Sequence, residues 1–152
     1  MKIIKYFFQF LIISILFFLF KIFGYKYSSD LGSIIGKNLG PFFRSKKVIM
    51  NNLKRVFPEI EIKEINILIK DMWSNYGRIL SDYIFIKNLR ISQFDKYIEI
   101  EGIEILKKIK DQKQPVIFIS GHFNNFELLA MSIEKSGIDL AAIYRPLNNI
   151  FL

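Results

Sequence analysis

An apolar segment near the amino terminus places the strongest restriction on how this chain can fold. Residues 6–20 lie between Lys5 and Lys21, and Gln9 is their only strongly polar side chain. A helix that crosses a bilayer needs about 20 such residues, so this segment is short for a span. If both lysines extend their charged ends to the membrane surface, the usable segment widens to residues 3–23, which is long enough. We therefore predict an amino-terminal membrane helix.

A cleaved signal peptide is the alternative, because Lys2 and Lys5 precede the apolar run. The sequence that follows, residues 21–26, lacks the pair of small residues that marks a cleavage site. We therefore predict a retained anchor over residues 1–24. Lysines flank both ends of the run, so the charge distribution leaves its orientation open, although the larger basic cluster after Phe20 favours a cytoplasmic body.

Positive charge is concentrated in the first part of the chain. Residues 1–60 contain ten Lys or Arg and two Asp or Glu, whereas residues 61–152 contain twelve of each. The whole formal net charge of +8 thus belongs to the part that includes the apolar run. This pattern predicts contact with anionic membrane lipids. Nucleic acid is the rival partner, but no motif for binding it is recognisable, and we predict none.

Length and composition limit the remaining possibilities. A chain of 152 residues is expected to form one domain. The absence of cysteine excludes disulfides and thiolate metal sites. We divide the chain into a membrane anchor (residues 1–24), a helical basic region (25–95) and a partial α/β catalytic core (96–152).

Two helices are predicted in the helical basic region. The first begins near Pro41, ends before Pro58 and is basic and amphipathic, so its apolar face would contact either the protein or the membrane surface. The second covers residues 62–85, where apolar side chains recur every three or four positions around Trp73. We expect the second helix to pack in the core.

From residue 96 the pattern alternates between strands and helices. Residues 97–100, 115–120 and 138–144 are predicted strands, and residues 102–112 and 126–135 are predicted helices, the latter ended by Gly137. Right-handed crossovers would make the strands parallel. The predicted fold class is therefore α/β, with a membrane helix and amphipathic helices followed by a partial parallel βαβαβ sheet.

The junction after the second predicted strand contains His122, the only histidine of the chain, followed five positions later by Glu127. Positions five apart on one helix differ by about 140° and do not face each other, so the two can meet only if His122 lies in the turn before the helix. A neutral imidazole oriented by a carboxylate can accept a hydroxyl proton near neutral pH. The alternative is that His122 is structural or merely exposed, with Gly121 and Asn124 as turn residues.

Arg145 follows the third predicted strand, so it is expected at the same sheet edge as His122. There its guanidinium would bind a phosphate or carboxylate as a forked donor. A solvated arginine beside the turn-forming Pro146 is the equal alternative.

The order of several short segments resembles one family, the bacterial late acyltransferases of lipid A biosynthesis, within the glycerolipid acyltransferase-like superfamily. The matching segments are Asn52-Leu53, Phe57-Pro58-Glu59, the aromatic helix around Trp73, Glu101-Gly102, Gly121-His122-Phe123 with Phe126-Glu127, and Tyr144-Arg145-Pro146. The resemblance covers essentially the whole chain. The His-x-x-x-x-acid spacing is common by itself, but it is fairly specific in this order.

The resemblance implies transfer of a fatty acyl chain from acyl carrier protein to a hydroxyl of a lipid A precursor, at the bacterial inner membrane and facing the cytoplasm. His122 would be the base and Glu127 its orienting acid. Arg145 and, with weaker support, Asn124 would bind the substrate. No metal and no cofactor are implied.

Two departures from the family pattern affect this interpretation. The family commonly has Gly-Asn-Trp before the acid, whereas this chain has Asn124-Asn125-Phe126. Family members are also much longer, which predicts that this chain is an amino-terminal fragment. A lysophospholipid or glycerol-phosphate acyltransferase, and an inactive membrane-anchored remnant, stay open as alternatives.

Overall fold

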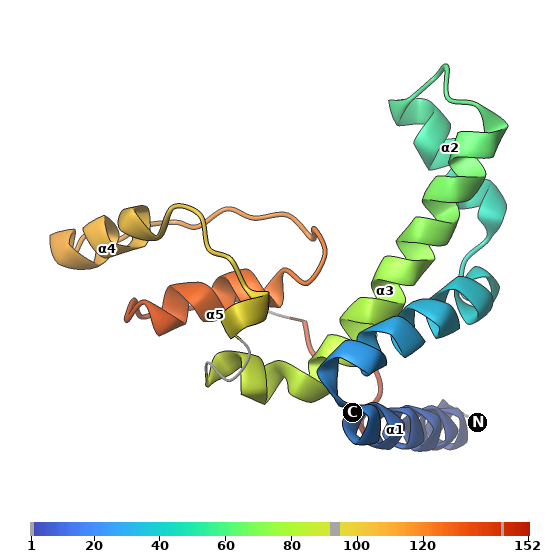
Figure 1. Ribbon diagram of the computed structural model, residues 1–152, viewed down its shortest axis with the longest axis horizontal. Helices are drawn as coiled ribbons and strands as arrows, with labels where there is room; N and C mark the ends of the chain where they lie inside the picture. The colour runs from blue at the N-terminus through green and yellow to red at the C-terminus, as the bar shows by residue number, and fades with distance from the viewer. Residues whose placement is uncertain (1, 92–94, 144) are drawn as a thin grey trace. The chain divides into compact units, whose positions relative to one another are not determined.

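The computed structural model describes residues 2–91, 95–143 and 145–152 (Figure 1). Their regular elements are all helical: α1 (Lys2–Leu39), the 3-10 helix η1 (Gly40–Phe42), α2 (Lys46–Val56), α3 (Ile62–Arg90), the 3-10 helix η2 (Asp95–Tyr97), α4 (Ile103–Gln112) and α5 (Glu127–Lys135). They belong to two compact units. The helical unit is Leu11–Phe85, and the split unit combines Met1–Phe10 with Ile86–Leu152.

The predicted apolar helix is present as the first part of α1. By length and composition, Lys2–Phe42 is one described helix able to cross a membrane, and only 6% of its most apolar window is buried. The helix changes direction at Gly24, whose φ of 74° and ψ of 169° are not helical (Figure 1). The buried Ser28 hydroxyl donates a hydrogen bond to the carbonyl of Phe20, which links the two sides of the break.

In the helical unit, α1 and α3 approach so closely that their backbones touch at glycines. A Cβ added to Gly77 of α3 would lie 1.9 Å from the Gly32 carbonyl oxygen, and one added to Gly36 would lie 2.1 Å from the carbonyl oxygen of Trp73. The hydroxyls of Ser33 and Ser74 are 2.7 Å apart and form a hydrogen bond between the two helices. Small residues on both helices therefore set the distance between them.

Helix α3 is longer than the predicted helix over residues 62–85. Its buried residues recur at intervals of four or eight positions: Ile65, Ile69, Gly77, Ser81, Phe85 and Leu89. This buried stripe includes the small residues Gly77 and Ser81, and other apolar residues of the predicted helix, such as Leu68 and Tyr76, are exposed. The predicted basic amphipathic helix is also present, but Pro41 opens only the short η1, and α2 begins five residues later at Lys46.

In the split unit, contacts join distant parts of the sequence. Arg90, the last residue of α3, forms an ion pair with Glu134 of α5. The Asn149 side chain donates a 3.0 Å hydrogen bond from Nδ2 to the carbonyl of Tyr6. The ring of Phe151 lies 5.9 Å from that of Phe7, centroid to centroid. The end of the described chain thus packs on the first turns of α1.

The predicted βαβαβ sheet is wrong: the described residues contain no strand. Tyr97 lies in η2, residues 98–100, 115–120 and 138–143 are irregular, and residue 144 is outside the described residues. The two intervening helices form where predicted, as α4 and α5, and Gly137 ends α5 with a left-handed φ of 78°.

There is a physical reason why the predicted helices form and the predicted strands do not. A helix satisfies its hydrogen bonds within one segment, whereas a strand needs paired neighbours, and a parallel sheet also needs both faces covered. Here Ile117 and Ile119 are 88% and 92% exposed, so nothing described covers the second predicted strand. The β-branched residues that favour a strand are present, but its pairing partners are not in place.

Hydrogen exchange can test this arrangement. We expect the backbone amides of residues 115–120 and 138–143 to exchange within seconds in this chain, because they lack a ladder of backbone hydrogen bonds. Amides of α3 in the helical unit should exchange far more slowly. Mass spectrometry of peptides from the two regions gives the comparison. Protection of residues 115–120 equal to that of α3 would contradict the structure and restore the predicted sheet.

Candidate active site

The predicted catalytic pair lies at the junction between an irregular segment and α5. His122 belongs to the irregular segment, and Glu127 is the first residue of the helix. His122 therefore precedes the helix, which is the position it needs if the two side chains are to meet.

The imidazole of His122 packs against the ring of Phe126. The two ring centroids are 4.4 Å apart and the ring planes are inclined by 58°. This contact restricts rotation of the imidazole, while the side chain as a whole stays exposed and accessible to a substrate. Phe126 was considered only as the residue that stands where the family commonly has tryptophan, and this contact was not predicted.

The two asparagines between the pair differ in environment. Asn124 is exposed and has a φ of 51°, in the left-handed region that asparagine tolerates better than most residues. Asn125 is buried, and its carbonyl accepts a 3.2 Å hydrogen bond from the amide of Leu128 in the first turn of α5. Asn124 thus supplies the left-handed backbone conformation of the turn. Its role in substrate binding is still a prediction.

Arg145 is exposed in the irregular segment after α5. No hydrogen bond or ion pair joins it to His122 in the described parts of the chain. His122 and Arg145 were predicted to meet at one edge of a parallel sheet, and the described residues contain no such sheet. The sheet therefore gives no support for a role of Arg145 in the site. Tyr144, its neighbour in the matching segment, lies outside the described residues.

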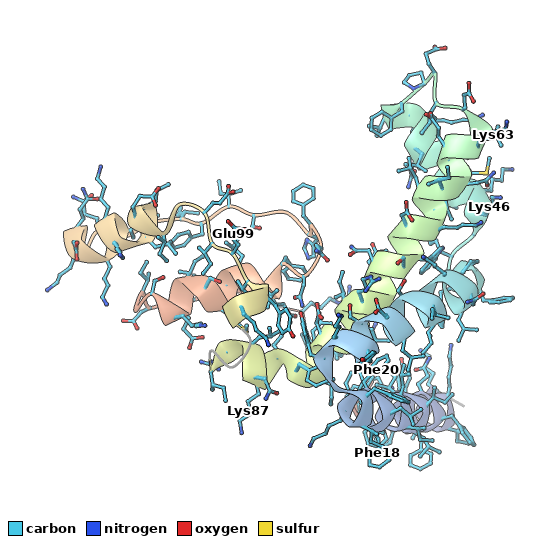
Figure 2. All side chains as sticks on the ribbon, viewed as in Figure 1. Phe18, Phe20, Lys46, Lys63, Lys87 and Glu99 are labelled. Atoms are coloured by element: carbon cyan, nitrogen blue, oxygen red, sulfur yellow. The ribbon has the colours of Figure 1, made fainter. Side chains whose placement is uncertain are left out.

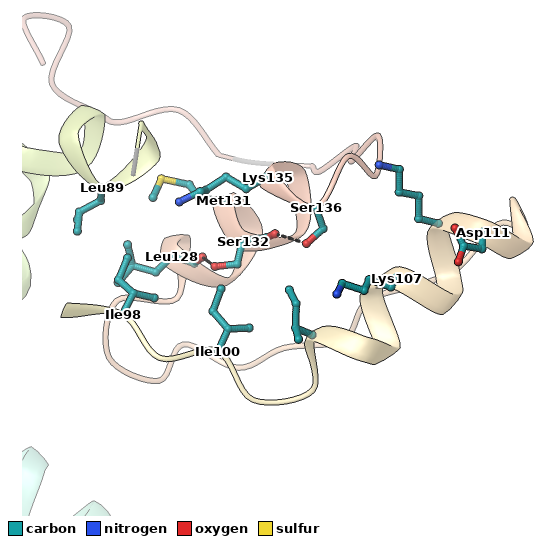
Figure 3. A pocket seen from close by; sticks show the side chains of 12 residues that line it. Leu89, Ile98, Ile100, Lys107, Asp111, Leu128, Met131, Ser132, Lys135 and Ser136 are labelled. Carbon is teal, nitrogen blue, oxygen red and sulfur yellow. Dashed lines mark hydrogen bonds between the residues drawn. The ribbon is translucent and has the colours of Figure 1, made fainter. Parts of the chain in front are cut away.

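An open cavity of about 680 Å³ lies beside α5 (Figure 3). Leu128 and Met131 line it from α5, Ile98 and Ile100 from an irregular segment, and Lys107 from α4. Ile98 and Ile100 were predicted to pair in the sheet, and they border open space instead. The cavity is within the size range of small-molecule sites. Leu128, one of the apolar residues that line the cavity, directly follows Glu127 in the sequence.

The described residues contain no group of three or more His, Asp or Glu side chains placed to bind a metal ion. The chemistry that the junction offers is proton transfer by an exposed imidazole, with a carboxylate five residues later at the start of a helix.

Comparison with known proteins gives a consistent result. A sequence model of the family described as bacterial lipid A biosynthesis acyltransferase matches residues 1–152. The chain is 28% identical over 122 residues to the lipid A biosynthesis palmitoleoyltransferase of Escherichia coli strain K12, a region that is 78% of this chain and 39% of that protein. It is equally similar, with the same coverage, to the lipid A biosynthesis acyltransferase of Shigella flexneri. The chain therefore spans about two fifths of the length of these curated relatives. No solved structure matches it significantly.

Proposed function

Because this chain belongs to the family of bacterial lipid A biosynthesis acyltransferases, we propose that it takes part in moving a fatty acyl chain from acyl carrier protein to a hydroxyl of a lipid A precursor. The observation that carries this proposal is the family match over residues 1–152, which includes His122 and Glu127. The relatives named as acyltransferases support the reaction class.

In the proposed reaction, His122 accepts the proton of the acceptor hydroxyl while that oxygen attacks the thioester carbonyl. The carbon–sulfur bond then breaks, and the thiol of the carrier leaves with the proton that the imidazolium returns. Glu127 orients the imidazole and stabilises its charged form. The exposure of His122 and the place of Glu127 at the start of α5 support these roles.

We assign Arg145 and Asn124 to substrate binding. The acceptor of such a reaction is anionic, and an exposed guanidinium is a suitable partner for its phosphate or carboxylate groups. The exposed amide of Asn124, two residues after His122, is close enough in sequence to contact the same substrate.

We further propose that the protein acts at the bacterial inner membrane with its catalytic region in the cytoplasm. The apolar helix and the excess of basic residues in the first part of the chain support membrane association. A cytoplasmic site is required if acyl carrier protein is the donor.

The relatives contain sequence that this chain does not match, and the isoleucines at 117 and 119 form exposed apolar surface that additional sequence would cover. We propose that activity needs such additional sequence, so that residues 1–152 supply one part of the enzyme. A separately encoded or continuous remainder would complete the core.

Inverted membrane vesicles, which expose the cytoplasmic face outward, test these proposals in one assay. The chain is assayed alone and co-expressed with the part of the Escherichia coli relative that it does not match. Acyl-acyl carrier protein is added outside, and transfer to a lipid A precursor is measured by mass spectrometry. We expect transfer in the co-expressed sample and none with glycerol phosphate as acceptor. Transfer to glycerol phosphate, or none to either acceptor in the presence of the complementing part, would contradict the proposal.

A further inference from the structure

A basic groove of about 510 Å³ lies in the helical unit where α1, α2 and α3 meet. Four cationic side chains line it: Lys37 from the last turn of α1, Arg44 from the segment before α2, Lys46 from the start of α2 and Lys70 from α3. Ile49 and Trp73 contribute apolar surface. Lys46 is labelled in Figure 2.

The groove has an unbalanced charge. None of the described residues that line it is acidic. The described ion pairs, Arg78 with Asp30 and Arg90 with Glu134, involve none of its four cations. Gathering four positive charges around one concavity raises the local potential and favours an anion.

Two phenylalanines beside the groove are almost fully exposed. Phe42 and Phe43 follow Pro41, which lines the groove, and precede Arg44; their exposed fractions are 87% and 82%. Consecutive exposed aromatic residues next to a basic site are unfavourable in water but match the boundary between lipid headgroups and acyl chains. Phosphate alone would use the cations and leave the phenylalanines in water.

We propose that this groove and the adjacent Phe42 and Phe43 form a docking surface for an anionic phospholipid bilayer. The phosphate of a lipid headgroup lies in the groove among Lys37, Arg44, Lys46 and Lys70, and the two phenyl rings enter the upper acyl region. This contact is separate from the apolar part of α1, and it does not depend on acyl transfer. Its selectivity for anionic lipid comes from the four cations.

A fluorescent probe can report on this surface in the full chain, because the sequence contains no cysteine that would compete for the label. Ser45 is exposed between two of the cationic residues and makes no side-chain cap bond to α2. Ser45→Cys is labelled with the environment-sensitive dye NBD, and the chain is reconstituted in nanodiscs of phosphatidylglycerol or phosphatidylcholine. An Asn75→Cys label, on an exposed position of α3 outside the groove, is the reference.

We expect quenching of the Ser45 label by doxyl-labelled lipid to be at least about fivefold stronger in phosphatidylglycerol than in phosphatidylcholine, with no such difference at Asn75. Arg44→Gln, Lys46→Gln and Lys70→Gln together should abolish that difference. The matched control removes three charges outside the groove, Lys54→Gln, Arg55→Gln and Lys63→Gln, and should preserve most of it. All six side chains are exposed, and circular dichroism checks that both variants fold.

Three results would overturn the proposal. Equal quenching in the two lipids would show that the charge of the bilayer has no effect at this surface. Equal losses in the two triple variants would show that net charge alone attracts the membrane. If inorganic phosphate or an RNA oligonucleotide shifted the Ser45 emission in phosphatidylcholine discs as strongly as phosphatidylglycerol does, the groove would be a site for that ligand and not for lipid.

Discussion

Replacing His122 with alanine is expected to lower acyl transfer by at least about a hundredfold, because a positioned base contributes roughly two to four orders of magnitude to a proton transfer. His122 is the only histidine of the chain, so no other imidazole can take over its role. The side chain is exposed, and its removal leaves no buried cavity, so the fold should be unaffected. The initial rate of transfer in the complemented vesicle assay gives the measurement.

Variants of the neighbouring residues can show whether His122 acts as a base or has only a structural role. Glu127→Gln keeps the size of the side chain and should cause a smaller loss than His122→Ala, because in the proposed mechanism the imidazole keeps its role as base and loses only the charge that stabilises its protonated form. Phe126→Leu removes the ring that contacts His122 and should reduce kcat with little change in KM. If His122→Ala were as active as the wild type, His122 would not be the base and the proposed mechanism would fail.

Asn124→Gly tests a different property of the same turn. Glycine adopts the φ of 51° at position 124 without strain, so this variant deletes the amide while preserving the backbone. A raised KM in Asn124→Gly would support a substrate contact. Unchanged kinetics would reduce Asn124 to a turn residue.

Helices could be predicted from the sequence because their evidence is local. The apolar repeat around Ile65 and Ile69 and the left-handed stop at Gly137 each depend on a few neighbouring residues, and both are present in the structure. The break at Gly24 was not predicted, since glycine within an apolar run does not by itself require a change of direction. The strands failed for the opposite reason, because β-branched residues such as Ile117 show only that a segment fits a sheet that other segments must complete.

In the candidate site, too, the features that depend on local sequence could be predicted and those that depend on distant segments could not. His122 in the turn and Glu127 at the start of a helix followed from their spacing, a local property, and the structure has this arrangement. The expected proximity of His122 and Arg145 relied on two parallel strands ending at one edge, and the described residues lack that edge. The contact of His122 with Phe126 depends on the orientation of two side chains, which the sequence pattern alone could not supply.

The second large effect is expected in the helical unit, where Gly77→Ala should destabilise the protein by about 2–3 kcal/mol. In an exposed helix the same replacement is stabilising by about 1 kcal/mol, since alanine has the higher helix propensity. Here the added Cβ would lie 1.9 Å from the Gly32 carbonyl oxygen, a backbone atom that can move only if α1 moves with it. Separating α1 from α3 would also stretch the hydrogen bond between Ser33 and Ser74. The clash therefore outweighs the gain in propensity.

Asn75→Ala is the matched control, because position 75 lies on the same helix but is exposed. It should leave stability unchanged or raise it by a few tenths of a kcal/mol. Unfolding of both variants in detergent micelles, followed by circular dichroism, gives the two free energies of unfolding.

Gly32→Ala should destabilise the protein about as much as Gly77→Ala, because its Cβ would lie 2.3 Å from the Gly77 carbonyl oxygen. The double variant should then cost less than the sum of the single variants, since one Cβ already moves the helices apart at the shared contact. If Gly77→Ala were as stable as Asn75→Ala, α1 and α3 would not be in backbone contact, and the arrangement of the helical unit would have to be revised.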